Sequence, residues 1–248
     1  MKILGIIPSR YSSTRFPAKA LADIAGKSMI QRTYEQAKQC ELLNDVIVAT
    51  DHQEIFDCVN RFDGQACMTK STHQSGTDRC YEALHVQANK YDYVINIQGD
   101  EPFINPEQIT QLAHLLDGKT QLATLVKTID HKEDIFNPNV VKVIFNQSNE
   151  AIYFSRNPIP FGRNFSQDEW HNNHTYHKHI GIYAYRTDIL KQITKLPTSS
   201  LENAESLEQL RWVENGYKIK IATTEFETIG IDTPEDLDKA LKIMKMES

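Results

Sequence analysis

Residues 2–20 read KILGIIPSRYSSTRFPAKA, an apolar run that leads directly into a loop of cations and hydroxyls. An apolar run with no polar alternation is typical of a β-strand buried on both faces of a parallel sheet. The loop carries Arg10, Arg15 and Lys19. Two interpretations are open: a solvated surface loop, or a pocket for a ligand with several negative charges.

The first half of the chain alternates strands with helices. Buried strands are expected at 45–50, DVIVAT, and at 91–98, YDYVINIQ. Helices are expected over about 28–39 and about 76–87, where apolar residues recur at helical spacing. Strands and helices that alternate in this way predict an α/β fold, with a mostly parallel sheet and helices on both faces.

The middle of the chain has a different pattern. Residues from about 122 to 186 are rich in strand-like runs, which predicts a small antiparallel insertion. Within it, residues 162–176, GRNFSQDEWHNNHTY, are polar and predict a long surface loop. The alternation then resumes, and one helix is expected from about 201 to 215. A chain of 248 residues, numbered 1–248, is expected to form a single domain.

Composition narrows the classes of function. The net charge is −6, so nonspecific binding of nucleic acid is not expected. No apolar run approaches the length of a membrane span, and the first residues are too short for a signal peptide. The four cysteines lack a Cys-x-x-Cys pair and are expected to be reduced thiols. We therefore expect a cytoplasmic protein with no nucleic-acid partner and no membrane insertion.

Two acidic segments follow predicted strands. Asp100 lies in QGDEP, and Asp232 lies in GIDTPEDL just before a predicted helix. Thr233 is expected to cap that helix, which leaves Asp232 without an assigned local role. Ligands collect at the carboxyl ends of parallel strands. The two aspartates could there share Mg²⁺, which takes few protein ligands and keeps waters and substrate oxygens.

The sequence lacks the usual glycine-rich nucleotide fingerprints, both Gly-x-x-x-x-Gly-Lys-Ser/Thr and Gly-x-Gly-x-x-Gly. A candidate nucleotide segment is HQSGTDR, residues 73–79, where Gly76 would let backbone approach a flat ligand and Arg79 adds a cation. The alternative is an ordinary helix start with Ser75 as N-cap.

An ordered set of motifs spans nearly the whole chain: PSRYSSTRFPAKALADIAGK, VATD, HQSGTDR, NIQGDEP, FNPNVVKV, YFSR, HIGIYAYR, SLEQLR and GIDTPEDL. Together they closely resemble the 3-deoxy-manno-octulosonate cytidylyltransferase family. The resemblance implies a Rossmann-like nucleotidyltransferase fold and a homodimer. It also implies Mg²⁺-dependent transfer of CMP from CTP to 3-deoxy-D-manno-octulosonate (Kdo), with release of pyrophosphate, for lipopolysaccharide synthesis.

The resemblance also implies roles for individual residues. Catalytic roles fall to Lys19, Asp100 and Asp232, with Asp100 and Asp232 as metal ligands. Nucleotide-binding roles fall to Arg10, Arg15, Lys19, Ser75, Gly76, Thr77 and Gln98. Contacts to Kdo fall to Gln98, Arg156, His179, Tyr183, Glu208 and Gln209. The segment at about 122–186 is then the part of the chain that serves substrate binding and dimerisation.

Several of these residues have a purely structural alternative. Arg156 could be an edge residue with a solvated tip, and Tyr183 could belong to the core. Glu208 and Gln209 could form the polar face of a helix. Four histidines, His171, His174, His177 and His179, lack the compact spacing of a zinc site. We interpret His171 and His174 as solvated, His177 is left open, and the resemblance makes His179 a substrate contact.

The first loop departs from the family pattern. The usual Leu-Pro-Gly-Lys-Pro-Leu is here Phe-Pro-Ala-Lys-Ala-Leu, so Ala18 and Ala20 replace a glycine and a proline. If the glycine position has a positive φ, Ala18 strains the turn. Loss of the proline frees the backbone at position 20. We expect these changes to affect loop geometry and CTP affinity more than the reaction, because Lys19 is retained.

The expected chemistry is an in-line displacement at the α-phosphorus of CTP, with Arg10 and Lys19 offsetting charge on the leaving pyrophosphate. One rival is a glycosyltransferase that uses a nucleotide sugar, although Asp100 is followed by Glu101-Pro102 rather than by an Asp-x-Asp motif. Closer rivals are cytidylyltransferases for 8-amino-Kdo or sialic acid. A non-enzyme rival is a nucleotide-binding relative that lost catalysis through Ala18 and Ala20.

Overall fold

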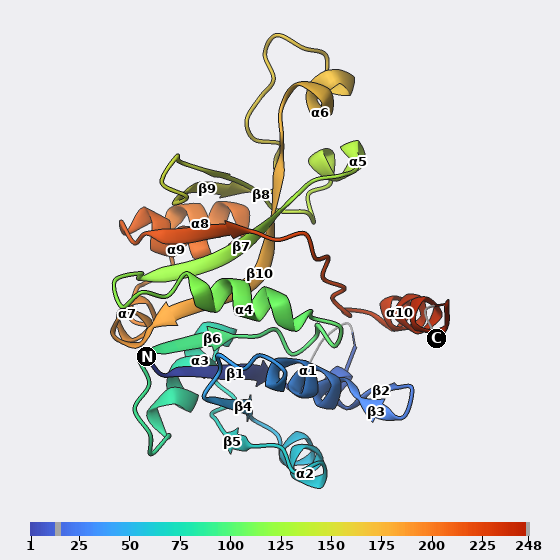
Figure 1. Ribbon diagram of the computed structural model, residues 1–248, viewed down its shortest axis with the longest axis vertical. Helices are drawn as coiled ribbons and strands as arrows, with labels where there is room; N and C mark the ends of the chain where they lie inside the picture. The colour runs from blue at the N-terminus through green and yellow to red at the C-terminus, as the bar shows by residue number, and fades with distance from the viewer. Residues whose placement is uncertain (13–15, 247–248) are drawn as a thin grey trace. The chain divides into compact units, whose positions relative to one another are not determined.

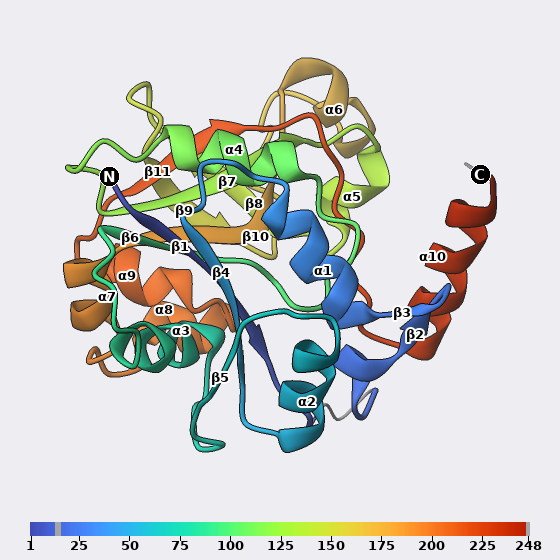
Figure 2. The ribbon, with the colours of Figure 1, turned by 60° about the horizontal axis from the view of Figure 1, so that its bottom comes forward.

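The structure is a computed structural model that describes residues 1–12 and 16–246. Two compact units divide the chain: residues 1–113 with 228–248, and residues 114–227. Figures 1 and 2 together label the helices and strands of both units. Among the described residues, no helix is long and apolar enough to cross a membrane.

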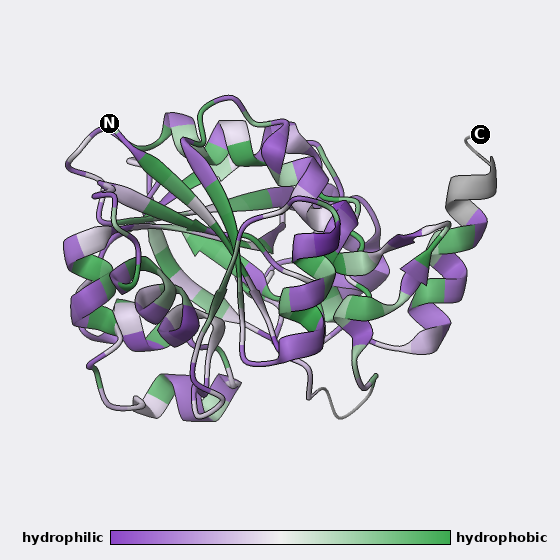
Figure 3. Cartoon of the chain, turned by 90° about the horizontal axis from the view of Figure 1, so that it is seen from below, coloured by the Kyte–Doolittle hydropathy of each residue, from purple (hydrophilic) through white to green (hydrophobic). Residues whose placement is uncertain are grey.

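The first unit is built on a parallel sheet with strand order β6-β1-β4-β5. Its strands are β1 (Ile3–Ser9), β4 (Asp45–Thr50), β5 (Ala66–Met68) and β6 (Tyr93–Asn96). Nearly every residue of β1 is buried, as its apolar sequence predicts. Figure 3 shows these strands as mostly hydrophobic. The expected parallel α/β architecture is confirmed for this part of the chain.

Three helices connect these strands: α1 (Met29–Lys38), α2 (Gln53–Arg61) and α3 (Gly76–His85); a further helix, α4 (Pro106–His114), follows β6. Because crossovers are right-handed, helices that lead in opposite directions along the sheet cover opposite faces. Figure 2 shows α1 on one face and α3 on the other. Serine side chains begin both helices, Ser28 at α1 and Ser75 at α3, each accepting a backbone N–H. The helices predicted at 28–39 and 76–87 are confirmed within two residues.

The end of the chain belongs to the same unit. The long helix α10 (Pro234–Met246) packs near the start of the chain, where Ile24, Met29, Ile231 and Ala240 form one apolar cluster. The short hairpin β2 (Asp23–Ile24) and β3 (Lys27–Ser28) contributes Ile24. Thr233 caps α10 as predicted, since its Oγ1 accepts the backbone N–H of Asp236 at 3.2 Å.

The second unit is a mixed sheet with strand order β11-β7-β10-β8-β9. Its strands are β7 (Leu122–Thr128), β8 (Lys142–Phe145), β9 (Ala151–Ser155), β10 (His177–Arg186) and β11 (Ile219–Thr223). β11 pairs with β7 in parallel, whereas β7 with β10, β10 with β8 and β8 with β9 pair antiparallel. The predicted antiparallel insertion is confirmed in this unit.

The helices of the second unit are short: α5 (Lys132–Phe136), α6 (Trp170–Asn173), α7 (Thr187–Ile193), α8 (Ser200–Glu205) and α9 (Gln209–Glu214). The single helix expected over 201–215 is wrong. Ser206 adopts a left-handed conformation with φ 53° and separates α8 from α9. The guanidinium of Arg156 donates to the carbonyl oxygens of Glu205 and Ser206, so tertiary contacts hold the chain where the helix stops.

The segment 162–176 is more structured than the expected surface loop. Trp170 is buried, and its Nε1–H donates to the carbonyl oxygen of Gly162 at 3.0 Å. Ring contacts join Trp170 to Phe136, Phe161 and Tyr176. In Figure 1 this segment, with α6, extends beyond the strands of its own unit. The ring contacts of Trp170, including the one to Phe136 outside the segment, therefore order a stretch whose sequence lacks helical periodicity.

The cysteines agree with the expectation of reduced thiols. Cys40, Cys58 and Cys80 are buried, Cys67 is partly buried, and all four are free. Burial, with the Glu82 carboxylate as a second cause, raises the pKa of the Cys67 thiol to about 11. This side chain is therefore protonated and unreactive at neutral pH.

Candidate active site

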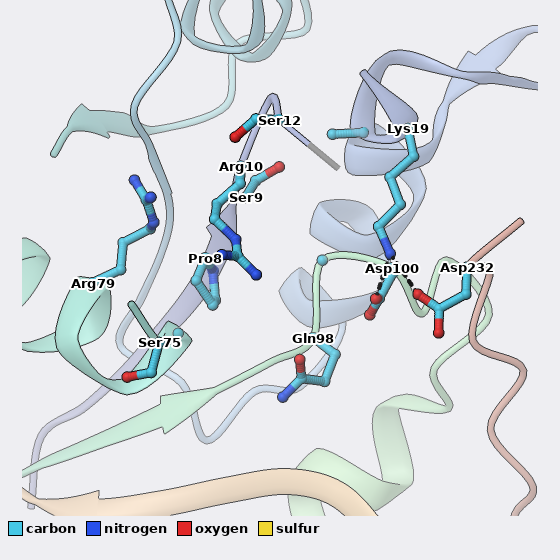
Figure 4. Close-up of a pocket in the computed structure, with 13 residues that line it drawn as sticks. Pro8, Ser9, Arg10, Ser12, Lys19, Ser75, Arg79, Gln98, Asp100 and Asp232 are labelled. Atoms are coloured by element: carbon cyan, nitrogen blue, oxygen red, sulfur yellow. Dashed lines mark hydrogen bonds and ion pairs between the residues drawn. The ribbon is translucent and has the colours of Figure 1, made fainter. Parts of the chain in front are cut away.

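A pocket of about 370 Å³ lies in the first unit. Its walls come from the loop after β1, the start of α3, the turn after β6 and the segment before α10. The carboxyl ends of parallel strands are where ligands are expected on such a sheet. The predicted residues that line the pocket are Arg10, Lys19, Ser75, Gly76, Gln98, Asp100 and Asp232. Figure 4 shows this group.

Lys19 lies between the two predicted metal ligands. Its Nζ is 2.7 Å from Oδ2 of Asp100 and 3.0 Å from Oδ1 of Asp232, and it also donates to the carbonyl oxygen of Ile231 at 3.2 Å. In Figure 4 its side chain extends from the loop toward both carboxylates. Burial lowers the pKa of Lys19, but attraction to the two aspartates outweighs burial and the net pKa is raised. The ammonium therefore stays charged at neutral pH.

Glu101, next to Asp100, does not add to the negative charge of the pocket. Its side chain is buried, and its pKa is raised to about 8, first by burial and then by the charge of Asp100. The carboxyl group is therefore neutral at pH 7. Of the two acidic residues in QGDEP, Asp100 therefore supplies a carboxylate to the site and Glu101 does not.

The loop after β1 closes through Ala18. Its backbone N–H donates to the carbonyl oxygen of Tyr11 at 3.0 Å, and it has φ 55° in the left-handed region. An alanine at positive φ is strained, because its Cβ approaches the carbonyl oxygen. The structure therefore bears out the expectation of a strained turn at Ala18. Lys19 begins the short 3₁₀ helix Lys19–Leu21 directly afterwards, and Ala20 is buried there.

Sequence reasoning missed the network that holds this loop against α3. Arg79 is 1% exposed, and its guanidinium donates to Oδ2 of Asp51 at 2.9 Å and to Oγ1 of Thr69 at 2.5 Å. Oδ1 of Asp51 accepts the backbone N–H of Tyr11 at 3.4 Å. The signal for Asp51 was present in the sequence: VATD places an acidic residue at the end of a buried strand.

Glycines allow the pocket walls to approach each other closely. A Cβ on Gly99 would lie 2.9 Å from the carbonyl oxygen of Pro8, and one on Gly76 would lie 3.4 Å from Cγ of Pro8. The turn after β6 and the start of α3 therefore pack directly on the end of β1. Thr77 is buried at the first turn of α3, and Gln98 lines the pocket. Arg15, the remaining predicted nucleotide residue, lies outside the described residues.

In the second unit, β10 brings His179 and Tyr183 together with ring centroids 5.1 Å apart. Nε2 of His179 lies 3.0 Å from Oγ1 of Thr124 on β7. Burial lowers the pKa of His179 to about 3, so its imidazole is neutral. Burial also raises the pKa of Tyr183, and among the described residues its hydroxyl has no hydrogen-bond partner. A neutral imidazole and a phenol suit the hydroxyl groups of a ligand.

The other predicted sugar contacts lie near the break between α8 and α9. Glu208 precedes α9, and Gln209 is its first residue and is buried. The Arg156 guanidinium donates to three backbone carbonyl oxygens, those of Glu205, Pro138 and Ser206. The guanidinium is therefore held by hydrogen bonds, although it is partly exposed, and is not the free side-chain tip that the structural alternative supposed. Nε2–H of His171 donates to the carbonyl oxygen of Ile129 at 3.1 Å, so this partly buried residue is not solvated as expected, whereas His174 is exposed as expected.

A cationic loop and two carboxylates, gathered where parallel strands end, define a site for a phosphorylated ligand and a nucleotidyltransferase class of protein. Comparison with known proteins makes the class narrower. The cytidylyltransferase family profile matches residues 4–221. The curated 3-deoxy-manno-octulosonate cytidylyltransferase of Parabacteroides distasonis is 57% identical over 98% of this chain and 98% of its own. That of Bacteroides thetaiotaomicron is 55% identical over 100% of both chains.

A solved structure agrees with these relatives. The structure of CMP:2-keto-3-deoxy-manno-octonic acid synthetase complexed with CTP is 42% identical and covers 100% of both chains with a TM-score of 0.93. The chain therefore belongs to the 3-deoxy-manno-octulosonate cytidylyltransferase family and is a nucleotidyltransferase enzyme. Its α/β nucleotidyltransferase fold, expected from the motifs, is confirmed.

Proposed function

We propose that this enzyme transfers CMP from CTP to Kdo, giving CMP-Kdo and pyrophosphate for lipopolysaccharide synthesis. The observation that carries the proposal is the pocket in which Arg10, Lys19, Asp100 and Asp232 meet. Both curated relatives carry the name of this activity, and the related solved structure holds CTP. The retained lysine and aspartates speak against a relative that only binds nucleotide.

The proposed reaction is an in-line displacement. The anomeric hydroxyl of the sugar attacks the α-phosphorus of CTP, its proton is lost, and the bond from that phosphorus to pyrophosphate breaks. Arg10 and Lys19 hold the phosphate oxygens and stabilise the negative charge on the departing pyrophosphate. Arg15 is proposed to assist them. Lys19 is close enough to reach phosphates in the same pocket by a side-chain rotation, since its Nζ already lies inside it.

The nucleotide is proposed to contact the start of α3. Ser75, Gly76 and Thr77 would face the cytosine and ribose, and Gln98 would lie near the reacting sugar. Gly76 fits this role because its lack of a side chain leaves room at the pocket wall beside Pro8. The backbone N–H groups of a helix start also offer donors to oxygen acceptors.

The donor set at the strand ends fits Mg²⁺, which we propose as the cofactor. Asp100 and Asp232 would hold it, because both carboxylates already point at one cation, the Lys19 ammonium. Magnesium binds through one or two carboxylates together with substrate phosphates. When bound it would lower the pKa of the attacking hydroxyl and polarise the α-phosphate.

The sugar acid is proposed to contact residues of the second unit: Arg156, His179, Tyr183, Glu208 and Gln209. Arg156 supplies positive charge for the carboxylate of Kdo, and the others supply neutral and acidic partners for its hydroxyls. The two units would then act as one catalytic domain over 1–248. We also propose a cytoplasmic location, where CTP is available, with no nucleic-acid or membrane partner.

We further propose that the enzyme is a homodimer that uses the segment at about 122–186. Phe161 is 73% exposed and Phe165 is 46% exposed, beside the aromatic group around Trp170. Exposed aromatic groups of this kind are typical of protein–protein contacts. Light scattering of the purified enzyme should give twice the 28.5 kDa chain mass, and F161S should shift it toward one chain. A monomeric wild type would contradict the proposal.

The test of the function is sugar-dependent release of pyrophosphate from CTP with Mg²⁺. Kdo, 8-amino-Kdo, sialic acid and no sugar are compared. Turnover with Kdo supports the proposal, and turnover with 8-amino-Kdo alone would move the assignment to that sugar. Release with sialic acid alone, or binding of CTP with no release under any sugar, would contradict it.

A further inference from the structure

Lys142, the first residue of β8, is a buried lysine that the proposed reaction does not use. It is 0% exposed, and its Nζ donates to the carbonyl oxygens of Asn137 at 2.8 Å and Val140 at 2.6 Å. Burial, and to a lesser extent the charge of Arg156, lowers the pKa of Lys142 to about 8, although the carboxylates of Glu205 and Asp134 raise it. A buried cation whose contacts are neutral carbonyls is costly, so a packing role alone does not account for it.

Arg156 holds the same loop from the other side. Its guanidinium donates to the carbonyl oxygen of Pro138 at 3.0 Å. Three of the four carbonyls in the loop 137–140 therefore accept hydrogen bonds from two cations, Lys142 and Arg156. The loop continues into Val141, directly before β8, and the Val141 carbonyl oxygen accepts the backbone N–H of His179 at 2.8 Å. The position of the loop is thus coupled to a predicted sugar contact.

Arg156 also holds the turn between α8 and α9. Its Nε donates to the carbonyl oxygen of Glu205 at 2.7 Å, and the guanidinium reaches that of Ser206 at 3.3 Å. In addition, the carboxylate of Glu205 accepts a hydrogen bond from the backbone N–H of Arg156 at 2.9 Å. This turn directly precedes Glu208 and Gln209, the other predicted sugar contacts.

The way in which Arg156 is held leaves its charge available. A guanidinium has five N–H donors in a fixed plane, and here three hydrogen bonds go to carbonyl oxygens, which carry no net charge. Arg156 is also partly exposed. A cation that is fixed in place but not neutralised by its immediate partners is suited to a ligand carboxylate.

We propose that Lys142 is a positioning residue for the sugar acid: it fixes the loop 137–140, and this loop fixes Arg156 and through it the turn that carries Glu208 and Gln209. This inference rests on the proposed function, since it concerns how the acidic sugar is bound. Lys142 itself does not touch the sugar. Its removal should therefore weaken sugar binding while it leaves nucleotide binding, which depends on the other unit, unchanged.

The test is the steady-state kinetics of K142M, which keeps the volume of the side chain and removes its charge and hydrogen bonds. We expect the KM for Kdo to rise by about tenfold, with kcat and the KM for CTP within about twofold of wild type. The matched control is K220M, because Lys220 also donates to a backbone carbonyl of this unit, that of Ser148 at 2.7 Å. K220M should leave all three constants unchanged.

Two further variants complete the test. E205Q weakens the same network without removing a buried cation, and it should raise the KM for Kdo in the same selective way if K142M does not fold. Because Lys142 acts through Arg156, the double variant K142M/R156K should bind Kdo about as weakly as R156K alone. A KM for Kdo that is unchanged in folded K142M or E205Q, or fully additive effects, would overturn the inference. A wild type inactive with Kdo would overturn the proposed function and the inference with it.

Discussion

Lys19 is the side chain on which the proposed binding of a triphosphate depends most. Its side chain is 18% exposed and its ammonium lies within 3.0 Å of two carboxylates, so this cation and these two anions are already paired in the pocket. A triphosphate offers the lysine new partners and would leave the two carboxylates facing a metal ion. Exchange of partners within one pocket needs only a side-chain movement, which is fast compared with turnover.

Asp100→Asn tests this arrangement. We expect turnover to fall by at least about 100-fold at saturating Mg²⁺, because an amide holds a divalent cation much less strongly than a carboxylate. The matched control is D130N, since Asp130 also pairs with a lysine, Lys127, at 2.5 Å but lies in the other unit. Near-normal turnover of D100N would remove the metal-binding role of Asp100.

Ala18→Gly should stabilise the enzyme. Glycine relieves the strain of φ 55° but loses more backbone entropy on folding, so we expect a net gain of about 0.5–1 kcal/mol in the free energy of unfolding. Ala25→Gly is the control, because Ala25 has φ 50° in the turn between β2 and β3. Both variants should gain stability in urea unfolding, but only A18G should change the KM for CTP. Loss of stability in A18G would contradict the assigned strain.

His179 should make the fold sensitive to acid. Its pKa is about 3 in the folded chain against an ordinary value of 6.5, so between these values the unfolded chain binds one more proton. Its contribution to stability is complete above pH 6.5 and is lost as the pH falls toward 3. Between pH 7 and pH 4 the free energy of unfolding should therefore fall less in H179Q than in the wild type, by on the order of 2 kcal/mol. Urea unfolding at the two pH values measures this difference. Equal losses in both proteins would contradict a neutral imidazole at His179.

Helices and strands were predicted well where one local pattern decides the outcome. The strand 45–50 and the helix that starts at Ser75 follow from continuous burial and from an N-cap. The break at Ser206 could not be predicted, because it depends on Arg156, a residue 50 positions earlier in the chain. Order in 162–176 likewise depends on Trp170 meeting distant aromatic rings.

The candidate site divides in the same way. The motifs identified Lys19 and Asp100, whose ion pair the structure shows. They did not identify Asp51, because its hydrogen bonds go to Tyr11 and Arg79, which are 40 and 28 positions away in sequence. They did not identify Lys142 either: its own hydrogen bonds are local, but the loop that it holds is also bound by Arg156, a residue 18 positions after Pro138. An acidic residue at a strand end and a lysine in an apolar strand were the only local signs.

Ser75→Ala tests whether the start of α3 serves both the fold and the nucleotide. Loss of the cap, in which Ser75 Oγ accepts the N–H of Asp78 at 3.1 Å, should cost about 1 kcal/mol in the free energy of unfolding. S199A removes a similar cap from α8 and should cost a similar amount. Only S75A should raise the KM for CTP. If S75A and S199A have the same KM for CTP, Ser75 serves the structure alone.

For the molecule as a whole, the two units carry different parts of the proposed reaction. The parallel unit holds the cations and carboxylates for the triphosphate and the metal. The mixed-sheet unit holds His179, Tyr183 and the Arg156 network, whose chemistry suits an acidic sugar rich in hydroxyls. Variants of the first group should change nucleotide constants, and variants of the second should change sugar constants.

The most direct test is a ³¹P NMR time course of the purified enzyme with CTP, Kdo and Mg²⁺. The account predicts that pyrophosphate and a CMP phosphodiester signal appear in equal amounts, at a rate that depends on Kdo, and that neither appears without the sugar. Loss of CTP signals to free CMP or CDP, without a new phosphodiester, would contradict transfer to the sugar. An unchanged CTP spectrum in the presence of folded enzyme and Kdo would contradict the account as well.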